Sequence, residues 1–226
     1  MSRFYATVGW TARLLFRVLY GVRVTGADRI PDTGAYLICS NHRSNLDPPL
    51  VGGFLKRQIS YFAKAELFDS KLGGAFLRRL NAFPVKRGQM DKAAMSTCLK
   101  VLSNGGALLF FPEGTRASST GFLYPKFGVG WVLRKTNVPV IPVYLHGTGT
   151  AAAFKGKRPQ LEIVIGEPIP PDEIIGDAGE NRDGYQLIAD RILDRIRQLS
   201  LETTVAKVSQ LAPIEGRDSI EDERLR

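Results

Sequence analysis

The sequence predicts an α/β domain with a layered, mixed and largely parallel sheet of about seven strands flanked by helices. Short apolar runs alternate along the 226 residues with segments of helical periodicity. Most of these runs are continuously apolar rather than alternating, which is typical of strands covered on both faces. The length suits one domain, and a composition that is 44% hydrophobic and 23% charged excludes a disordered or fibrous protein.

The elements follow from the same patterns, taken along the chain. We expect an N-terminal helix over residues 1–21, the main domain over residues 22–204 and a charged, flexible tail over residues 205–226. The expected strands are residues 22–25, 35–40, 59–64, 82–86, 107–111, 138–145 and 161–165. The expected helices are residues 48–57, 70–80, 91–104, 128–136 and about 183–200, and the Pro- and Gly-rich segment 168–184 is expected to be a linker loop.

The first helix is amphipathic. On a helix drawn at 100° per residue, Arg3 and Arg17 fall within about 80° of Arg13, and Trp10 and Tyr20 lie beside this arginine stripe. The opposite side carries apolar residues: Phe4, Val8, Leu15, Val18 and Leu19. The pattern predicts a helix that lies in the plane of a membrane interface, and the alternative is an ordinary helix packed on the domain.

No stretch reaches the roughly 18 to 20 apolar residues that a spanning helix needs. The arginines also interrupt any apolar region of a signal peptide. Membrane attachment is therefore expected to be peripheral, on the cytoplasmic face of the cell membrane, with help from basic residues such as Lys56, Arg57, Arg78 and Arg79.

Charge and cysteine usage narrow the function. Residues 1–158 hold 23 basic and 7 acidic residues, so an anionic partner is expected there, whereas the remainder is acidic. Cys39 and Cys98 are too few and too differently placed for a disulfide framework or a metal site, which favours a reducing compartment. No dinucleotide loop, P-loop or metal-ligand spacing occurs, so no cofactor and no metal are expected. Nucleic-acid binding is not predicted, because no helix-turn-helix, zinc or stacking-aromatic signature is present.

The strongest chemical signal follows the second expected strand. There a polar turn runs from Asn41 to Asp47, which is a good N-cap, and Pro48 suits the first position of a helix. His42 leaves the strand and Asp47 opens the helix, so a five-residue turn can fold the carboxylate back onto the imidazole. A His–Asp pair is a general base whose orientation and cationic state the carboxylate stabilises. No serine or cysteine nucleophile stands on a suitable turn, so the histidine is expected to activate a hydroxyl of the substrate.

Two further clusters follow strands. The first is Phe110-Phe-Pro-Glu-Gly-Thr-Arg116, in which Gly114 lets the backbone approach a ligand, Thr115 offers a hydroxyl and Arg116 can bind a phosphate with two donors. Glu113 fits an acceptor that orders an arginine or binds a substrate hydroxyl. The second cluster is Phe83-Pro-Val-Lys-Arg-Gly88, which places two cations after a strand.

These blocks resemble, in order and spacing, the 1-acyl-glycerol-3-phosphate (lysophosphatidic acid) acyltransferase family. The matching blocks are His42-x4-Asp47, Phe83-Pro-Val-Lys-Arg87, Phe111-Pro-Glu-Gly-Thr-Arg116 and Val138-Pro-Val-Ile-Pro-Val143, with Ala63-Lys-Ala-Glu-Leu-Phe68 between the first two. The resemblance covers about residues 20–170 and implies the glycerol-3-phosphate acyltransferase-like fold.

The resemblance also implies roles. His42 would take the proton of the free hydroxyl of 1-acyl-glycerol-3-phosphate, which then attacks the thioester of acyl-CoA or acyl-carrier protein with no covalent enzyme intermediate, and Asp47 would support the histidine. The acceptor's phosphate would be held by Arg87, Glu113, Gly114, Thr115 and Arg116. Lys64 and Lys86 are accessory candidates, although the family often carries an acidic residue where Lys86 stands.

The product would be phosphatidic acid, and the partners would be a lysophospholipid, the thioester donor and an anionic membrane surface. Two alternatives stay open at this point. The same fold can acylate a different lysolipid, such as an amino-lipid or a glycolipid. A catalytically silent membrane-binding module would keep the N-terminal helix, but it would not need His42, Asp47 and Glu113 together.

Overall fold

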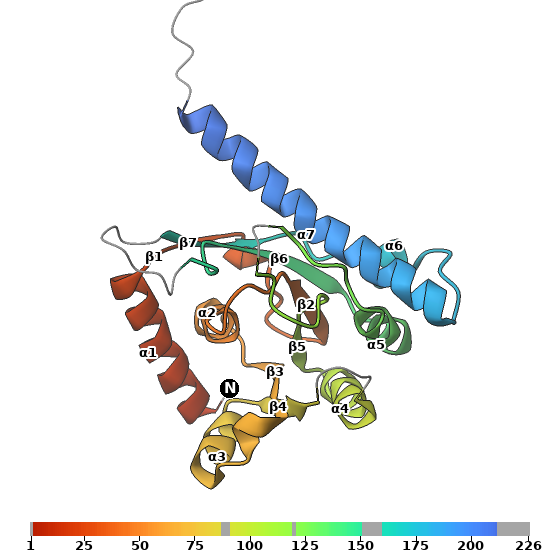
Figure 1. Ribbon diagram of the computed structural model, residues 1–226, viewed down its shortest axis with the longest axis horizontal. Helices are drawn as coiled ribbons and strands as arrows, with labels where there is room; N and C mark the ends of the chain where they lie inside the picture. Colours follow the sequence, from red (N-terminus) through yellow and green to blue (C-terminus); the bar gives the residue numbers. More distant parts are fainter. Residues whose placement is uncertain (1, 87–90, 119–120, 151–159, 212–226) are drawn as a thin grey trace, which may run out of the picture.

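The computed structural model describes residues 2–86, 91–118, 121–150 and 160–211. These residues form a seven-stranded sheet in the order β1-β7-β6-β2-β5-β3-β4 (Figure 1). Neighbouring strands are parallel except β6 and β7, which are antiparallel. Consequently β6, β2, β5, β3 and β4 run in one direction, while β7 and β1 run in the other. The predicted fold class is confirmed.

The strands are β1 (Gly21–Thr25), β2 (Tyr36–Ser40), β3 (Ile59–Lys64), β4 (Ala82–Val85), β5 (Ala107–Phe110), β6 (Val140–His146) and β7 (Gln160–Ile165). The helices are α1 (Arg3–Leu19), α2 (Asp47–Phe54), α3 (Lys71–Arg79), α4 (Lys92–Ser103), α5 (Gly128–Thr136), α6 (Pro171–Ile175) and α7 (Arg182–Leu211), with short 3₁₀ turns η1 (Ala27–Arg29) and η2 (Ala65–Phe68). Each predicted strand is present, with ends that differ by at most two residues.

Local signals in the sequence set several helix ends. The Ser70 hydroxyl accepts a hydrogen bond from the Gly73 amide at the start of α3, and the Asp91 carboxylate accepts from the amides of Ala93 and Ala94 at the start of α4. At the end of α5, Asn137 adopts a left-handed conformation with φ of 49°.

The expected linker loop over residues 168–184 is wrong, because it contains α6. Ile174 and Ile175 of this five-residue helix are buried in the core, and Gly176 ends it with φ of 49°. The helix is too short to produce a periodic pattern, and the surrounding Pro, Gly and Asp residues hid it. The last helix, α7, continues to Leu211, beyond the expected domain boundary at residue 204, and the remainder of the expected tail lies outside the described residues.

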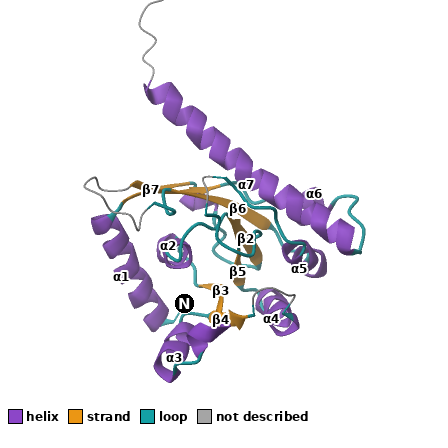
Figure 2. Ribbon diagram, viewed as in Figure 1, coloured by secondary structure: helices purple, strands orange, loops and turns teal. Residues whose placement is uncertain are grey.

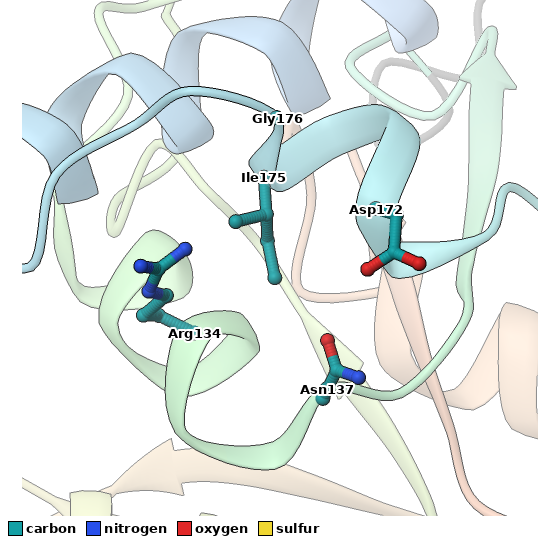
Figure 3. Close-up of a pocket in the computed structure, with 5 residues that line it drawn as sticks. All are labelled: Arg134, Asn137, Asp172, Ile175 and Gly176. Carbon is teal, nitrogen blue, oxygen red and sulfur yellow. The ribbon is translucent and has the colours of Figure 1, made fainter.

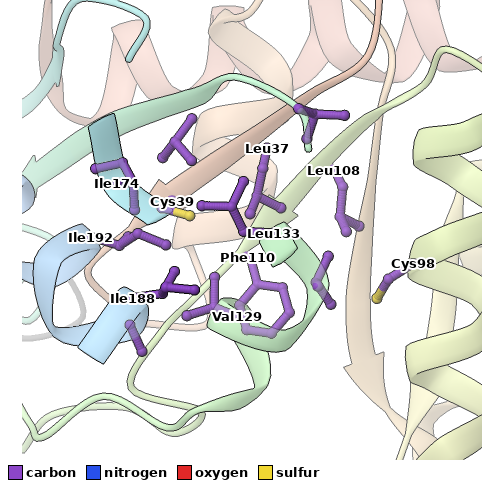
Figure 4. Close-up of a cluster of buried hydrophobic side chains, with 14 of the residues drawn as sticks. Leu37, Cys39, Cys98, Leu108, Phe110, Val129, Leu133, Ile174, Ile188 and Ile192 are labelled. Carbon is purple, nitrogen blue, oxygen red and sulfur yellow. The ribbon is translucent and has the colours of Figure 1, made fainter. Parts of the chain in front are cut away.

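Helices cover both faces of the sheet, as the continuous apolar strands predict (Figures 1 and 2). Side chains alternate along β2, so Leu37 and Cys39 face α4, α5 and α7, whereas Tyr36 and Ile38 face α1 and α2. Figure 4 shows the first of these cores, where residues of β2 and β5 meet α5 and α7: Leu37, Cys39, Leu108, Phe110, Val129, Leu133, Ile188 and Ile192. The sheet, packed on both faces, therefore fixes the positions of the residues that follow its strands.

The first helix packs on the domain through the side that carries Tyr5, Arg13 and Phe16. The Arg13 Nε donates to the Gly53 carbonyl over 2.7 Å, and the guanidinium groups of Arg13 and Arg17 lie over the Phe54 ring of α2. Tyr5 and Phe16 of the same side are buried. Most of the predicted apolar side points outward, although Phe4 and Val8 are half-buried. The large exposed apolar residues of the helix are Trp10, Leu14, Leu15, Val18 and Leu19.

Candidate active site

Five strands end at one edge of the sheet, and most of the predicted site residues follow these ends. His42 follows β2, Glu113 follows β5, Lys64 closes β3 and Lys86 follows β4. Because these strands are parallel, their carboxyl ends lie side by side, which is where open α/β sheets bind ligands. The topology thus brings Glu113 into contact with His42, although 71 positions separate them in the sequence.

His42 and Asp47 form the predicted pair. The His42 Nδ1 lies 2.8 Å from the Asp47 Oδ2, the aspartate is fully buried and the histidine side chain is 8% exposed. The His42 ring also stacks on Phe111, with centroids 4.1 Å apart. Because Nδ1 bonds the carboxylate, Nε2 is the nitrogen that can receive a substrate proton, and it makes no hydrogen bond within the described part of the chain.

The role of Asp47 in its helix differs from the expected one. Asp47 is the first residue of α2, and Leu46 takes the N-cap position without a side-chain hydrogen bond. Its carboxylate is instead turned back, and Oδ2 accepts from the amides of Arg43 and Ser44 over 2.7 and 2.8 Å. The same oxygen therefore holds the turn and the imidazole together, so the orientation of His42 is set by local geometry.

Glu113 lies beneath this turn, 1% exposed, and connects two segments. Its Oε1 accepts from the His42 amide over 2.9 Å and its Oε2 from the Leu123 amide over 2.7 Å. Burial raises the pKa of Glu113, and the two amides together with the charges of His42 and Arg43 act against that rise. Both carboxylate oxygens are thus occupied by the backbone, so we regard Glu113 as a positioning residue rather than a contact to phosphate.

Glu113→Ala is expected to destabilise the fold and to slow the reaction. The substitution leaves two amides without their acceptor, and each buried unpaired group costs roughly 1–3 kcal/mol. Thermal unfolding should show a clear fall in Tm. Glu180→Ala is the matched control, because Glu180 is a surface carboxylate paired with Arg134 and Lys135, and its loss should change Tm little. Equal Tm values for the two variants would contradict this role of Glu113.

The turn after Glu113 presents exposed donors. Gly114, Thr115 and Arg116 are all exposed, and Gly114 adopts the left-handed region with φ of 65°. Arg116 forms no ion pair within the described residues. Lys64 lies 3.2 Å from Glu66, an exposed pair that leaves the lysine accessible, and Lys86 is exposed. The predicted contact Arg87 lies outside the described residues, so its position stays a prediction.

Two residues of this region were missed by the sequence analysis. Arg43 follows His42, and its guanidinium packs against the backbone of Gly149 in the loop after β6. Lys126 lies against Gly114, and its amide donates to the Pro112 carbonyl over 2.8 Å. Arg43 lies inside the His42-x4-Asp47 block but at one of its unspecified positions, and Lys126 lies outside the blocks. The only signal for them in the sequence is the excess of basic residues over positions 1–158.

The cysteines are remote from this chemistry. Both are buried as free thiols, and burial raises the pKa of Cys39 and raises that of Cys98 to about 12. Neither is therefore a ready thiolate nucleophile. Among the described residues, no group of three or more His, Cys, Asp or Glu side chains is placed to hold a metal ion. The expectation that no cofactor is needed stays a prediction.

A pocket of about 450 Å³ lies elsewhere, at the amino end of β6 (Figure 3). It is lined by Arg134, Asn137, Asp172, Ile175 and Gly176. The parallel strands place this end on the opposite edge of the sheet from His42, and no predicted site residue lines the pocket. We therefore assign the chemistry to the edge that carries His42.

The fold and the site together are typical of one class of enzyme. In this chain a buried His–Asp pair at the carboxyl ends of the parallel strands lies beside a cationic turn that contains a glycine. The family model described as "Acyltransferase" matches residues 21–146. The chain is 32% identical over 150 residues to a 1-acyl-sn-glycerol-3-phosphate acyltransferase of Bacillus subtilis, covering 66% of this chain and 74% of that protein.

A 1-acyl-sn-glycerol-3-phosphate acyltransferase of Streptococcus pneumoniae is 28% identical over 200 residues, covering 86% of this chain and 72% of that protein. The crystal structure of the 1-acyl-sn-glycerophosphate acyltransferase PlsC from Thermotoga maritima is similar with a TM-score of 0.68 and 26% identity, covering 87% of this chain and 79% of that one. The chain belongs to the acyltransferase family, and it is an O-acyltransferase.

Proposed function

We propose that this enzyme transfers a fatty acyl group from a thioester to the free hydroxyl of a 1-acyl-glycerol 3-phosphate, giving phosphatidic acid for phospholipid biosynthesis. The observation that carries the proposal is the His42–Asp47 contact of 2.8 Å, which lies beside the exposed turn of residues 114–116. The names of the bacterial relatives support this choice of acceptor.

The proposed reaction is direct. The His42 Nε2 removes the proton of the acceptor hydroxyl while the hydroxyl oxygen attacks the carbonyl carbon of the thioester. The tetrahedral intermediate then collapses, the carbon–sulfur bond breaks, and the departing thiolate takes the proton from the imidazolium. Asp47 stabilises the imidazolium between these two transfers. The enzyme ends in its starting protonation state, and no acyl group is ever bound to it.

The phosphate of the acceptor is proposed to bind at the turn after β5. Arg116 offers a planar guanidinium with several donors, Thr115 adds a hydroxyl, and Gly114 leaves its backbone approachable. Arg87, which follows β4 in the sequence, is also proposed to contribute, and Lys64 and Lys86 are proposed as accessory cations. A phosphate that carries about two negative charges would thereby anchor the acceptor with its hydroxyl near His42.

The donor is proposed to be acyl-CoA or acyl-carrier protein. Both are acidic, so both suit the basic first part of the chain. Assays with matched acyl chains on the two carriers distinguish them by kcat/KM. The direct mechanism is tested at the same time by intact-protein mass spectrometry after incubation with donor alone. The direct mechanism requires that no acyl adduct of the protein accumulates, and an adduct on a protein side chain would contradict this mechanism.

We also propose that the enzyme binds peripherally to the cytoplasmic face of the cell membrane through α1. No helix within the described ranges is both long and apolar enough to cross a bilayer. The outward side of α1 carries Trp10 and Val18, which are 65% and 63% exposed. The ring of Phe4 contacts that of Phe76 in α3, and the exposed apolar residues Leu67 of η2 and Leu72 of α3 belong to the same part of the chain as Phe76.

Of the basic residues expected to help membrane attachment, Arg79 is better placed for this role than Arg57. Arg57 donates to the carbonyls of Gly34 and Gly105, which precede β2 and β5, and lies over the Tyr36 ring. It is therefore held at the amino edge of the sheet. Arg79 lies over Phe4 of α1, so this cation is placed beside the apolar surface and suits contact with anionic headgroups.

The double substitution Leu15→Glu and Val18→Glu is expected to release the enzyme from vesicles. Each apolar side chain buried in the interface contributes about 1.5–3 kcal/mol, so partitioning should fall by on the order of 100-fold or more. Cosedimentation with vesicles that contain phosphatidylglycerol measures the change. Leu201→Glu is the matched control, because Leu201 is 66% exposed on α7. Unchanged binding of the double variant would contradict attachment through α1.

A further inference from the structure

Lys126 is held directly over the turn that carries Arg116. A Cβ atom placed on Gly114 would lie 2.9 Å from the Cδ, 3.2 Å from the Cε and 3.4 Å from the Nζ of Lys126. The lysine stem therefore fills the space that a side chain at position 114 would occupy. Its backbone is fixed as well, because the Lys126 amide donates to the Pro112 carbonyl. The backbone and the side chain of Lys126 are therefore both positioned by this turn.

The turn that carries Glu113 and the segment that leads to Lys126 are also connected to His42. The Glu113 carboxylate joins the His42 amide to the Leu123 amide, three residues before Lys126. The Gly114 amide donates to the carbonyl of Phe111, whose ring stacks on the imidazole. The Lys126 side chain therefore belongs to the same structure that positions His42, although Lys126 lies ten positions after Arg116 in the sequence.

The charge of Lys126 is not balanced by the protein described. Lys126 is exposed and forms no ion pair within residues 2–86, 91–118, 121–150 and 160–211. The acidic residue of the turn, Glu113, uses both oxygens on backbone amides. Arg116 is likewise without an ion pair in these ranges. Both cations are thus associated with this turn and lack an acidic partner in these ranges, and a doubly charged anion would be attracted to both.

We propose that Lys126 binds the phosphate of the lysolipid acceptor together with Arg116, and that it helps select phosphate-bearing acceptors over neutral ones. The inference rests on the proposed function and names a contact that neither the motifs nor the comparisons assign. It also explains the glycine at position 114, where the left-handed conformation and the lysine stem both exclude a side chain.

Lys126→Met tests the proposal, because methionine keeps an unbranched apolar stem and removes the charge. Steady-state kinetics should be measured with lysophosphatidic acid and with 1-acylglycerol, which lacks the phosphate. We expect KM for lysophosphatidic acid to rise by about tenfold or more, as the loss of a charged hydrogen bond implies, with kcat and the turnover of 1-acylglycerol little changed. Lys126→Arg should restore most of the affinity.

Lys135→Met is the matched control, since Lys135 pairs with Glu180 at the end of α5. The proposal would be overturned if Lys126→Met left the ratio of the two acceptors' kcat/KM values unchanged. An equal loss with both acceptors is one such result, and it would indicate a packing role for Lys126. Failure of the proposed function looks different: the wild-type enzyme itself would not acylate lysophosphatidic acid. The assignment of Lys126 would then fall with it.

Discussion

His42→Ala is expected to abolish acyl transfer while leaving the fold intact. Loss of a general base lowers turnover by roughly 10²- to 10⁴-fold. The side chain lies at a strand end and contacts Asp47 and Phe111 rather than the main cores, so α-helix and sheet content should be retained. Rates of phosphatidic acid formation measure the first effect, and circular dichroism with thermal unfolding measures the second.

The chain offers a matched control, because it has only two histidines. His146 ends β6 at the same edge of the sheet and is exposed. His146→Ala should retain transfer activity. A folded His42→Ala variant that transfers acyl groups at the wild-type rate would exclude His42 as the base.

Asp47→Asn is expected to give the second large effect, and it isolates the charge from the geometry. All three donors, at His42, Arg43 and Ser44, meet the single oxygen Oδ2. The other oxygen, Oδ1, is buried without a hydrogen-bond partner in the described structure. An asparagine can therefore place its carbonyl oxygen at the Oδ2 position and keep the turn. What it loses is the negative charge that stabilises the imidazolium.

We expect kcat of Asp47→Asn to fall by on the order of 10²- to 10⁴-fold, with KM for the acceptor little changed. Stopped-time assays across a range of acceptor concentrations separate the two constants. Asp177→Asn is the control, because Asp177 is an exposed carboxylate paired with Arg191. A rise in KM at unchanged kcat would instead place Asp47 in substrate binding.

The parts of this enzyme that the sequence predicts well are local. The His42–Asp47 contact lies within one turn, so the five-residue spacing predicts it once the strand before His42 and the helix after Asp47 are recognised. The strands are equally readable, since β2 and β5 are buried on both faces and leave continuous apolar runs such as Tyr36–Ser40. Family resemblance then joins blocks that are distant in the sequence but follow parallel neighbouring strands.

The parts that the sequence does not predict depend on the path of loops and on backbone donors. Glu113 is recognisable as an acid in a motif, but its partners are the amides of His42 and Leu123, and amides leave no trace in the sequence. Lys126 reaches Gly114 only because the chain after the turn folds back on it. Neither relation has a fixed spacing.

The orientation of α1 also needed the structure. Helical periodicity identifies a cationic and an apolar side, but either side of such a helix can face the domain. Here the guanidinium groups of Arg13 and Arg17 lie over the Phe54 ring of α2, so this border of the arginine stripe faces the domain. The apolar side is left outward as a result, and this arrangement supports the proposed attachment to the membrane.

The most direct test of the proposed function is the identity of the product. Purified wild-type enzyme should be supplied with one acyl thioester and, in separate reactions, with lysophosphatidic acid, a neutral lysolipid and an amino-lipid acceptor, and the lipids should be identified by mass spectrometry. Our account predicts phosphatidic acid as the dominant product, formed at the highest kcat/KM. It would be contradicted if lysophosphatidic acid were not acylated while another acceptor was.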